Sequence, residues 1–172
     1  MSLFETERLV ARRLVAEDAA AMAAIYGDSE AMKYVGDSRP LTPEICAHWV
    51  DVTNRNFERR GYGMIALIRK TDGAMVACAG IVHPDQQEEP EVKYALRRDA
   101  WGAGYATEAV CGLVRYAEEH LALRWMQSTV HPDHAASQRV LSKASFHHTR
   151  DRENEDGSFT QIWEWSASNP ES

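Results

Sequence analysis

The stretch that decides the fold of this chain is Trp101-Gly102-Ala103-Gly104-Tyr105-Ala106-Thr107-Glu108-Ala109. Small residues at 102, 103, 104 and 106 follow a predicted strand over 92–96 and precede an amphipathic helix. A turn with so few side chains lets an anion reach bare backbone N–H groups, and the dipole of the following helix favours negative charge there. The stretch therefore predicts a strand-to-helix turn that holds a phosphate-bearing ligand.

The length and composition predict one globular domain over residues 1–172. The chain is 44% apolar and 26% charged, which suits a single hydrophobic core. Its 26 acidic residues outnumber its 19 basic ones, giving a net charge of −7, whereas a general nucleic-acid binder needs a basic face. The sequence shows no membrane-spanning segment and no signal pattern at its N-terminus. We therefore expect a cytoplasmic protein that binds neither nucleic acid nor membranes.

The cysteines give no indication of a metal centre or of disulfides. Cys46, Cys78 and Cys111 are far apart, odd in number and without metal-ligand spacing. Reduced thiols and no bound metal are the expectation.

The pattern along the chain predicts an α/β (α+β) fold with a mixed, mostly antiparallel central sheet of about seven strands flanked by about four helices. Apolar runs predict strands over 8–14, 62–68, 75–82, 91–97, 124–130, 146–150 and 159–165. Helical spacing predicts helices over 17–26 and 43–60, another from the glycine turn to about 120, and one beginning at 132–134. Turn residues separate the first two helices at Gly36, Asp37 and Pro40.

Two common phosphate-binding motifs fit the glycine turn poorly. A nucleoside triphosphate loop needs Gly-Lys-Ser/Thr at the helix start, but here Gly104 precedes Tyr105. A dinucleotide fingerprint needs a third small residue where Thr107 stands, and an acid about 20 residues later, where the chain reads Thr129-Val130-His131. A nicotinamide-dependent oxidoreductase is therefore disfavoured.

The turn resembles the cofactor motif of the GNAT superfamily of N-acetyltransferases, Gln/Arg-x-x-Gly-x-Gly/Ala. Trp101-x-x-Gly104-x-Ala106 matches its last two places. The longer string from Tyr94-Ala95-Leu96 to Ala109 is similar to the RimJ/RimL-like branch, where an aromatic residue often precedes Gly-x-Gly-Tyr-Ala-Thr-Glu-Ala. The segment 131–146 also resembles the family's Asn-x-x-Ser … Gly-Phe helix, and Thr6-Glu7-Arg8-Leu9 resembles the branch's opening. These matches occur in the family's order along the whole chain.

Three positions depart from the family pattern. His134 occupies the usual Asn place and Ser145 the usual Gly place. Leu141 stands where many relatives carry a tyrosine acid, and it cannot protonate a leaving thiolate. His134 can still offer a ring N–H to a pantetheine arm.

The resemblance implies the acyl-CoA N-acyltransferase fold and direct acetyl transfer from acetyl coenzyme A (acetyl-CoA), as cosubstrate, to a primary amine, either a protein N-terminal α-amine or a small-molecule amine. The turn at 102–107 would hold the pyrophosphate, the open edge of the strand at 94–96 the pantetheine, and an N–H near Leu96 the oxyanion. Dimerisation is common in this branch, so a homodimer is a further expectation. The expected cosubstrate-binding residues are Tyr94, Ala95, Leu96, Trp101, Gly102, Ala103, Gly104, Tyr105, Ala106, Thr107, His134 and Ser137.

Glu91 and Ser137 are the expected catalytic residues. Glu91, on the predicted strand 91–97, is the preferred base, acting directly or through water; the alternative is a solvated strand residue. Ser137 is expected to meet the departing thiolate, and its alternative is a hydrogen bond to its own helix backbone. His83 and His131 lie at strand ends, where each is either a proton relay or an exposed loop histidine.

Other residues have structural interpretations. Glu108, in the first helical turn, complements the helix dipole and is expected to stabilise the helix start. Trp101 is either a core anchor, which we favour, or a lid on the cosubstrate. The helix 43–60 and the loop 84–90 are expected to flank the acceptor cleft. Because of Leu141 and His134, a non-catalytic acyl-CoA sensor or scaffold on the same fold is the alternative function.

Overall fold

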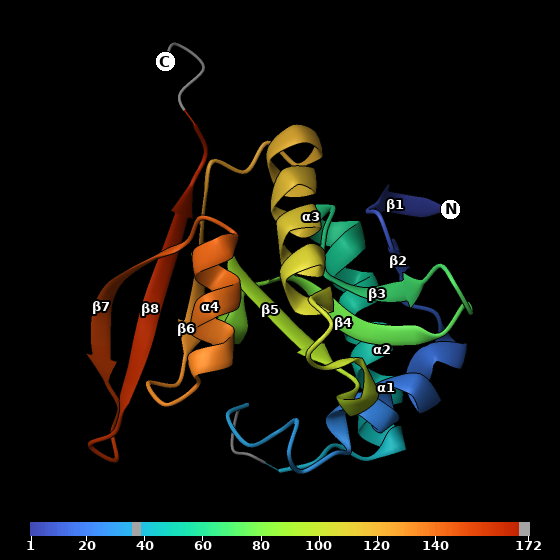
Figure 1. The fold of residues 1–172 in the computed structure, drawn as a ribbon, viewed down its shortest axis with the longest axis horizontal. Helices are drawn as coiled ribbons and strands as arrows, with labels where there is room; N and C mark the ends of the chain where they lie inside the picture. The colour runs from blue at the N-terminus through green and yellow to red at the C-terminus, as the bar shows by residue number, and fades with distance from the viewer. Residues whose placement is uncertain (36–38, 169–172) are drawn as a thin grey trace.

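The centre of the molecule is an eight-stranded sheet with strand order β1-β2-β3-β4-β5-β6-β8-β7 (Figure 1). It is seen in a computed structural model, which describes residues 1–35 and 39–168. The strands are β1 Ser2–Glu5, β2 Leu9–Arg13, β3 Met64–Arg69, β4 Met75–Val82, β5 Glu91–Leu96, β6 Trp125–Val130, β7 His147–Glu153 and β8 Phe159–Ser166. The α-helices within the described residues are α1 Ala19–Tyr26, α2 Pro43–Arg60, α3 Tyr105–His120 and α4 Ala135–Lys143.

The predicted fold class is confirmed, with one additional strand. All neighbouring strands pair antiparallel except β5 and β6, which are parallel and joined through α3. The strand that the sequence did not predict is β1, whose four residues are too few to show an alternating pattern. Of the turn expected between the first two helices, Gly36 and Asp37 lie outside the described residues.

Two apolar cores cover the two faces of the sheet. Helices α3 and α4 pack on one face, in front of the sheet in Figure 1, and α1 and α2 on the other. The central strand β4 is buried along almost its whole length because both helix layers cover it. None of the helices within residues 1–35 and 39–168 combines the length and the apolar run that crossing a bilayer requires.

Helix α2 forms where its sequence signals predict. The hydroxyl of Thr42 accepts a hydrogen bond from the N–H of Ile45 (3.3 Å), and Pro43 opens the first turn. Gly61 ends the helix in the left-handed conformation (φ +84°), which glycine adopts without a Cβ clash. These ends fix the α2 side chains that face β3 and β4.

The sheet opens between β5 and β6. Their ladder contains one residue pair, Glu91 with Gln127, and the Ser128 hydroxyl adds a bond to the Val92 carbonyl (2.9 Å). Past this point the two strands diverge, as Figure 1 shows. The second half of β5 therefore has a free edge, and the candidate site is built around it.

Candidate active site

The glycine turn presents backbone N–H groups to solvent. Gly102 (φ +78°) and Gly104 (φ +83°) adopt left-handed conformations that other residues take only with strain. Gly104 precedes α3 and has no side chain to cap it. The first bond of the helix runs from the Glu108 N–H to the Gly104 carbonyl (3.1 Å). The N–H groups of residues 105–107 consequently have no intrahelical acceptor, and they belong to the turn at 102–107 for which anion binding is predicted.

The free edge of β5 carries its own unpaired backbone groups. In an antiparallel pair, alternate residues direct their N–H and C=O groups to the same neighbour. The N–H of Arg97 bonds to the Val76 carbonyl (2.8 Å), so the odd-numbered residues of β5 pair with β4. The backbone groups of Tyr94 and Leu96 face the gap instead. The indole of Trp101 uses one of them by donating to the Leu96 carbonyl (3.1 Å).

The turn, the β5 edge and α4 enclose one cavity of about 650 Å³, which we call the α3–α4 cavity. Its size is typical of small-molecule and cofactor sites. All of the expected cosubstrate-binding residues line it except Ala103. The sequence did not point to Tyr34, or to Arg139 and Lys143 on α4, which also line it, because no local motif marks them.

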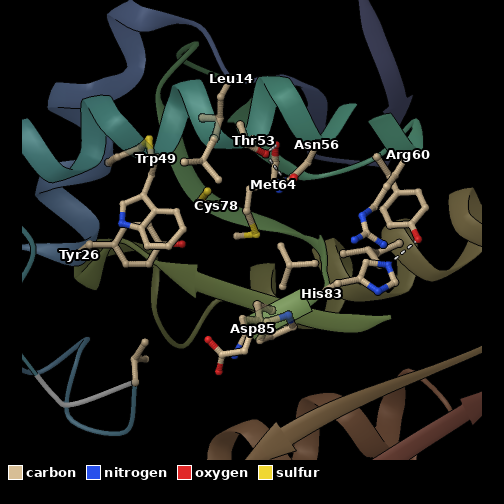
Figure 2. Close-up of a pocket in the computed structure, with 18 of the residues that line it drawn as sticks. Leu14, Tyr26, Trp49, Thr53, Asn56, Arg60, Met64, Cys78, His83 and Asp85 are labelled. Atoms are coloured by element: carbon tan, nitrogen blue, oxygen red, sulfur yellow. Dashed lines mark hydrogen bonds between the residues drawn. The ribbon is translucent and has the colours of Figure 1, made fainter. Parts of the chain in front are cut away.

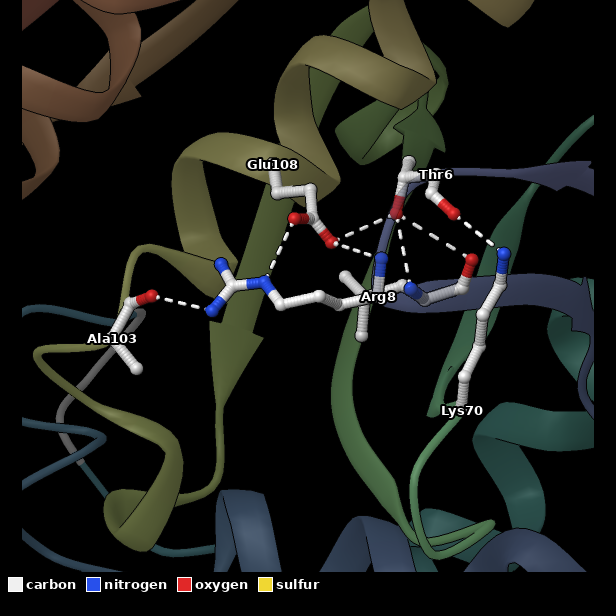
Figure 3. A network of polar contacts seen from close by, with 6 residues as sticks. Thr6, Arg8, Lys70, Ala103 and Glu108 are labelled. Carbon is white, nitrogen blue, oxygen red and sulfur yellow. Dashed lines mark hydrogen bonds and ion pairs between the residues drawn. The ribbon is translucent and has the colours of Figure 1, made fainter.

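A polar network locks the turn to the N-terminal segment (Figure 3). The Arg8 guanidinium donates to the Ala103 carbonyl (2.8 Å) and to the Glu108 carboxylate (3.0 Å). The Thr6 hydroxyl donates to the other Glu108 oxygen (2.8 Å), and Lys70 donates to the Thr6 carbonyl (2.7 Å). The Ala103 carbonyl therefore holds the turn in place through Arg8, while Gly102 and Gly104 on either side of it line the cavity.

Glu108 is held in its charged form. Its burial acts to raise its pKa, but the hydrogen bonds from Arg8 and Thr6 outweigh burial, and the pKa is lowered. Its place in the first turn of α3 agrees with the expected role at the helix start. The preference for Trp101 as a core anchor is wrong: the side chain is 46% exposed and lines the α3–α4 cavity.

Ser137 and Tyr94 meet inside this cavity. Ser137 is buried, and in the described part of the chain its hydroxyl bonds to the Tyr94 hydroxyl and not to the backbone of its own helix. The Tyr94 hydroxyl also lies 3.4 Å from the Ser137 carbonyl. Burial raises the pKa of Tyr94 to about 12, although the hydrogen bond with Ser137 acts to lower it. Tyr94 is therefore a neutral phenol at physiological pH.

His134 precedes α4 and closes one side of the cavity. Its ring stacks on Tyr34 with a centroid distance of 4.7 Å, and Tyr34 also contacts His131 (4.8 Å). Burial lowers the pKa of His134, and the nearby His131 lowers it further. The ring is thus neutral at pH 7 and has both a donor and an acceptor nitrogen. Leu141 is fully buried in the core and offers no acid.

Glu91 lies apart from the cavity that its predicted role requires. It is 3% exposed, so the alternative of a solvated strand residue is wrong. One carboxylate oxygen accepts from the Gln127 amide (3.1 Å) and the other pairs with Lys93 (2.9 Å). Glu91 lines neither of the two cavities described for residues 1–35 and 39–168. Its role as the base stays a prediction.

A second cavity of about 370 Å³, which we call the α2 cavity, opens on the other face of the sheet (Figure 2). Helix α2 and the residues after β4 line it, as expected for the acceptor cleft, and Val35 lines both cavities. Both ring nitrogens of His83 make hydrogen bonds. Nδ1 bonds to the Gln87 carbonyl (3.0 Å), and Nε2 bonds to the Tyr62 hydroxyl (2.7 Å). Because a carbonyl only accepts, Nδ1 of a neutral His83 carries the hydrogen, and Nε2 accepts from Tyr62.

The site has the features of a group-transfer enzyme with two substrates. These are a glycine turn suited to phosphate, an open strand edge, and cavities on both faces of one strand. Residues 8–147 match the family model described as the acetyltransferase (GNAT) domain. The chain belongs to this family and is an N-acetyltransferase.

The relatives cover nearly the whole chain. An uncharacterised N-acetyltransferase, p20, from Bacillus licheniformis is 26% identical over 147 residues, which are 85% of this chain and 83% of the relative. A GNAT-family acetyltransferase from Bacillus anthracis has a similar fold, with a TM-score of 0.80 and 19% identity over 94% of this chain and 96% of the other. The ribosomal-protein α-N-acetyltransferase RimL in complex with coenzyme A has a TM-score of 0.82 at 13% identity, over 96% and 98% of the two chains.

Proposed function

We propose that this protein transfers the acetyl group of acetyl-CoA to a primary amine by direct attack. The observation that carries the proposal is the α3–α4 cavity, where the glycine turn and the free edge of β5 face the same space. A homodimer and membership of the RimJ/RimL-like branch belong to the same proposal and rest on the resemblance to that branch. A cytoplasmic location, expected from the sequence, is proposed with them.

The α3–α4 cavity suits a coenzyme A thioester along its whole length. The N–H groups of residues 105–107 would donate hydrogen bonds to the pyrophosphate. Arg139 and Lys143, one helical turn apart, would add positive charge for the phosphates. The backbone groups of Tyr94 and Leu96 would pair with the pantetheine amides. The acetyl group would then lie at the gap in the sheet, within reach of the α2 cavity.

The attacking amine must lose its proton before it can react. An amine with a lysine-like pKa is neutral about 0.04% of the time at pH 7, and one with the pKa of a protein N-terminus roughly 10–15%. We propose that the Tyr62–His83 pair takes this proton: the Tyr62 oxygen receives it while Tyr62 passes its own hydrogen to Nε2 of His83. His83 then carries the positive charge beside the Gln87 carbonyl.

Ser137 and Tyr94 would stabilise the leaving thiolate without protonating it. The pKa of Tyr94 is about 12, whereas a thiol has a pKa near 8.5, so proton transfer from Tyr94 to the thiolate is unfavourable by roughly three orders of magnitude. If Tyr94 donates to Ser137, the Ser137 hydrogen is free to bond the sulfur. The C–N bond forms as the C–S bond breaks, the amine proton goes to His83, and the thiolate takes its proton from solvent.

Calorimetry with acetyl-CoA, together with a thiol-release assay over a panel of primary amines, tests this function. We expect micromolar binding and amine-dependent release of thiol. No binding at high micromolar acetyl-CoA would refute the proposal, and binding without thiol release for any amine would favour the acyl-CoA sensor.

The two candidate bases can be compared directly. If His83 accepts the proton, His83→Gln lowers kcat by about 10²–10⁴-fold. Glu91→Gln, with nearly the same shape, should leave the pH profile of kcat unchanged. The opposite ranking would restore Glu91 as the base.

A further inference from the structure

The α2 cavity has two ends of different chemistry, and this difference indicates which amine it takes. One end is apolar and is formed by α1 and the first half of α2. Met22, Tyr26 and Trp49 line it, and Figure 2 shows the aromatic rings of Tyr26 and Trp49 at the same end of the view. Trp49 is 48% exposed, whereas tryptophan is highly buried on average. This end fits a large apolar or aromatic group.

The other end is cationic, although the chain as a whole has a net charge of −7. Arg59, Arg60 and Lys93 are the cations among the described residues that line the cavity, against the single carboxylate of Asp85. Arg59 bonds to the Gln86 amide (3.1 Å), and Lys93 is paired with the buried Glu91. A cation-rich cavity on an acidic protein would repel polycationic amines and attract an anion.

Arg60 differs in its contacts from the other two cations. It is half-buried at the end of α2, and among residues 1–35 and 39–168 no hydrogen bond or ion pair engages it. Figure 2 shows its guanidinium on the same side of the cavity as His83, to which Tyr62 is hydrogen-bonded, and the Asp85 carboxylate pointing away from it. A guanidinium is suited to bidentate binding of a carboxylate or phosphate, and a bound anion would satisfy donors that are now unused.

We propose that the acceptor is a compact amino acid-like molecule, with a large apolar or aromatic side chain and a carboxylate on the carbon that bears the amine. This inference rests on the proposed acetyl transfer. The carboxylate binds Arg60, which places the neighbouring amine beside the Tyr62–His83 pair, and the side chain fills the end lined by Trp49. The nearby positive charge also favours the neutral, reactive form of the amine. A cavity of about 370 Å³ holds one such molecule.

The test compares four acceptors in the thiol-release assay: phenylalanine, phenylalaninamide, 2-phenylethylamine and spermidine. We expect kcat/KM for phenylalanine to exceed that of the two acceptors without a carboxylate at least tenfold, and spermidine to be the poorest. Arg60→Met should raise KM for phenylalanine at least tenfold and leave 2-phenylethylamine unchanged. Arg55→Met, which removes an exposed arginine of α2 outside the cavity, is the matched control and should change neither.

A binding experiment separates this inference from the proposed function. N-acetylphenylalanine, the expected product, should bind the wild-type protein in calorimetry and lose at least tenfold in affinity in Arg60→Met, whether or not the protein turns over. Equal use of phenylalanine and 2-phenylethylamine, a preference for spermidine, or an equal effect of Arg60→Met on all acceptors would overturn the inference while acetyl transfer stands. Absence of acetyl-CoA binding would remove the proposed function, and the acceptor assignment with it.

Discussion

Replacing Gly104 by glutamate places a carboxylate where the pyrophosphate is expected to bind. The residue has φ +83° and lines the α3–α4 cavity, and a new Cβ would lie 3.4 Å from an Arg8 nitrogen. Left-handed strain should cost about 1–2 kcal/mol of stability. Repulsion between two unit charges about 4 Å apart, at an effective dielectric constant near 20, adds about 4 kcal/mol to the binding free energy. Coenzyme A affinity should therefore fall by roughly 10³-fold.

A matched variant in a distant turn separates strain from charge. Gly157, in the β7–β8 turn, has the same φ of +83° and open space around its Cα, so Gly157→Glu carries the strain alone. Both variants should lose roughly 2–8 °C in Tm, but only Gly104→Glu should lose affinity in calorimetry. Gly104→Gln retains the bulk without the charge and should fall between them. Equal coenzyme A affinity in Gly104→Glu and Gly157→Glu would refute the assignment of the turn as the phosphate site.

Three further predictions concern the groups around the same turn. Ser137→Ala should lower kcat about tenfold or more and change the acetyl-CoA dissociation constant less than twofold, because its bond to Tyr94 serves the leaving thiolate; unchanged turnover would remove Ser137 from the mechanism. Arg8→Lys loses the bond to the Ala103 carbonyl and should weaken coenzyme A binding about tenfold with kcat nearly unchanged, and an equal fall in both would contradict a positioning role. Because the pKa of Glu108 is lowered in the folded state, its contribution to stability is present above its unfolded pKa of about 4.3 and is lost as the pH falls through the folded value. The Tm of Glu108→Gln should thus depend less on pH below about 4.5 than the wild-type Tm, and parallel curves would disprove this.

Local patterns in the sequence were sufficient for most of the fold. The start of α2 at Pro43 and its end at Gly61 followed from capping and turn residues, which act within one helical turn. The glycine turn before α3 was predicted for the same reason, since Gly102 and Gly104 need the conformations that they adopt. The missed strand β1 is held by pairing with β2 and not by a pattern of its own.

The site was less predictable because it depends on contacts between distant segments. Arg8 and Ala103 are 95 positions apart in sequence, and neither residue type indicates that one will hold the other. The Tyr62–His83 pair likewise joins the segment before β3 to the residue after β4, and the sequence around Tyr62 predicts only a strand residue. The sequence left a solvated strand residue as the alternative for Glu91, because strand alternation does not reveal its contacts with Gln127 and Lys93.

The alternation of β5 explains how one strand can serve two substrates. Successive side chains of a strand point to opposite faces of the sheet, so the side chains of Tyr94 and Leu96 lie on the face of the α3–α4 cavity and that of Lys93 on the face of the α2 cavity, while Ala95 at the free edge also lines the α3–α4 cavity. In the proposed reaction, the acetyl group lies at the gap between β5 and β6. A shift of β5 by one residue against β4 would exchange both sets of side chains. The register of Ala77 opposite Leu96 is therefore as necessary to the proposed chemistry as any single catalytic group.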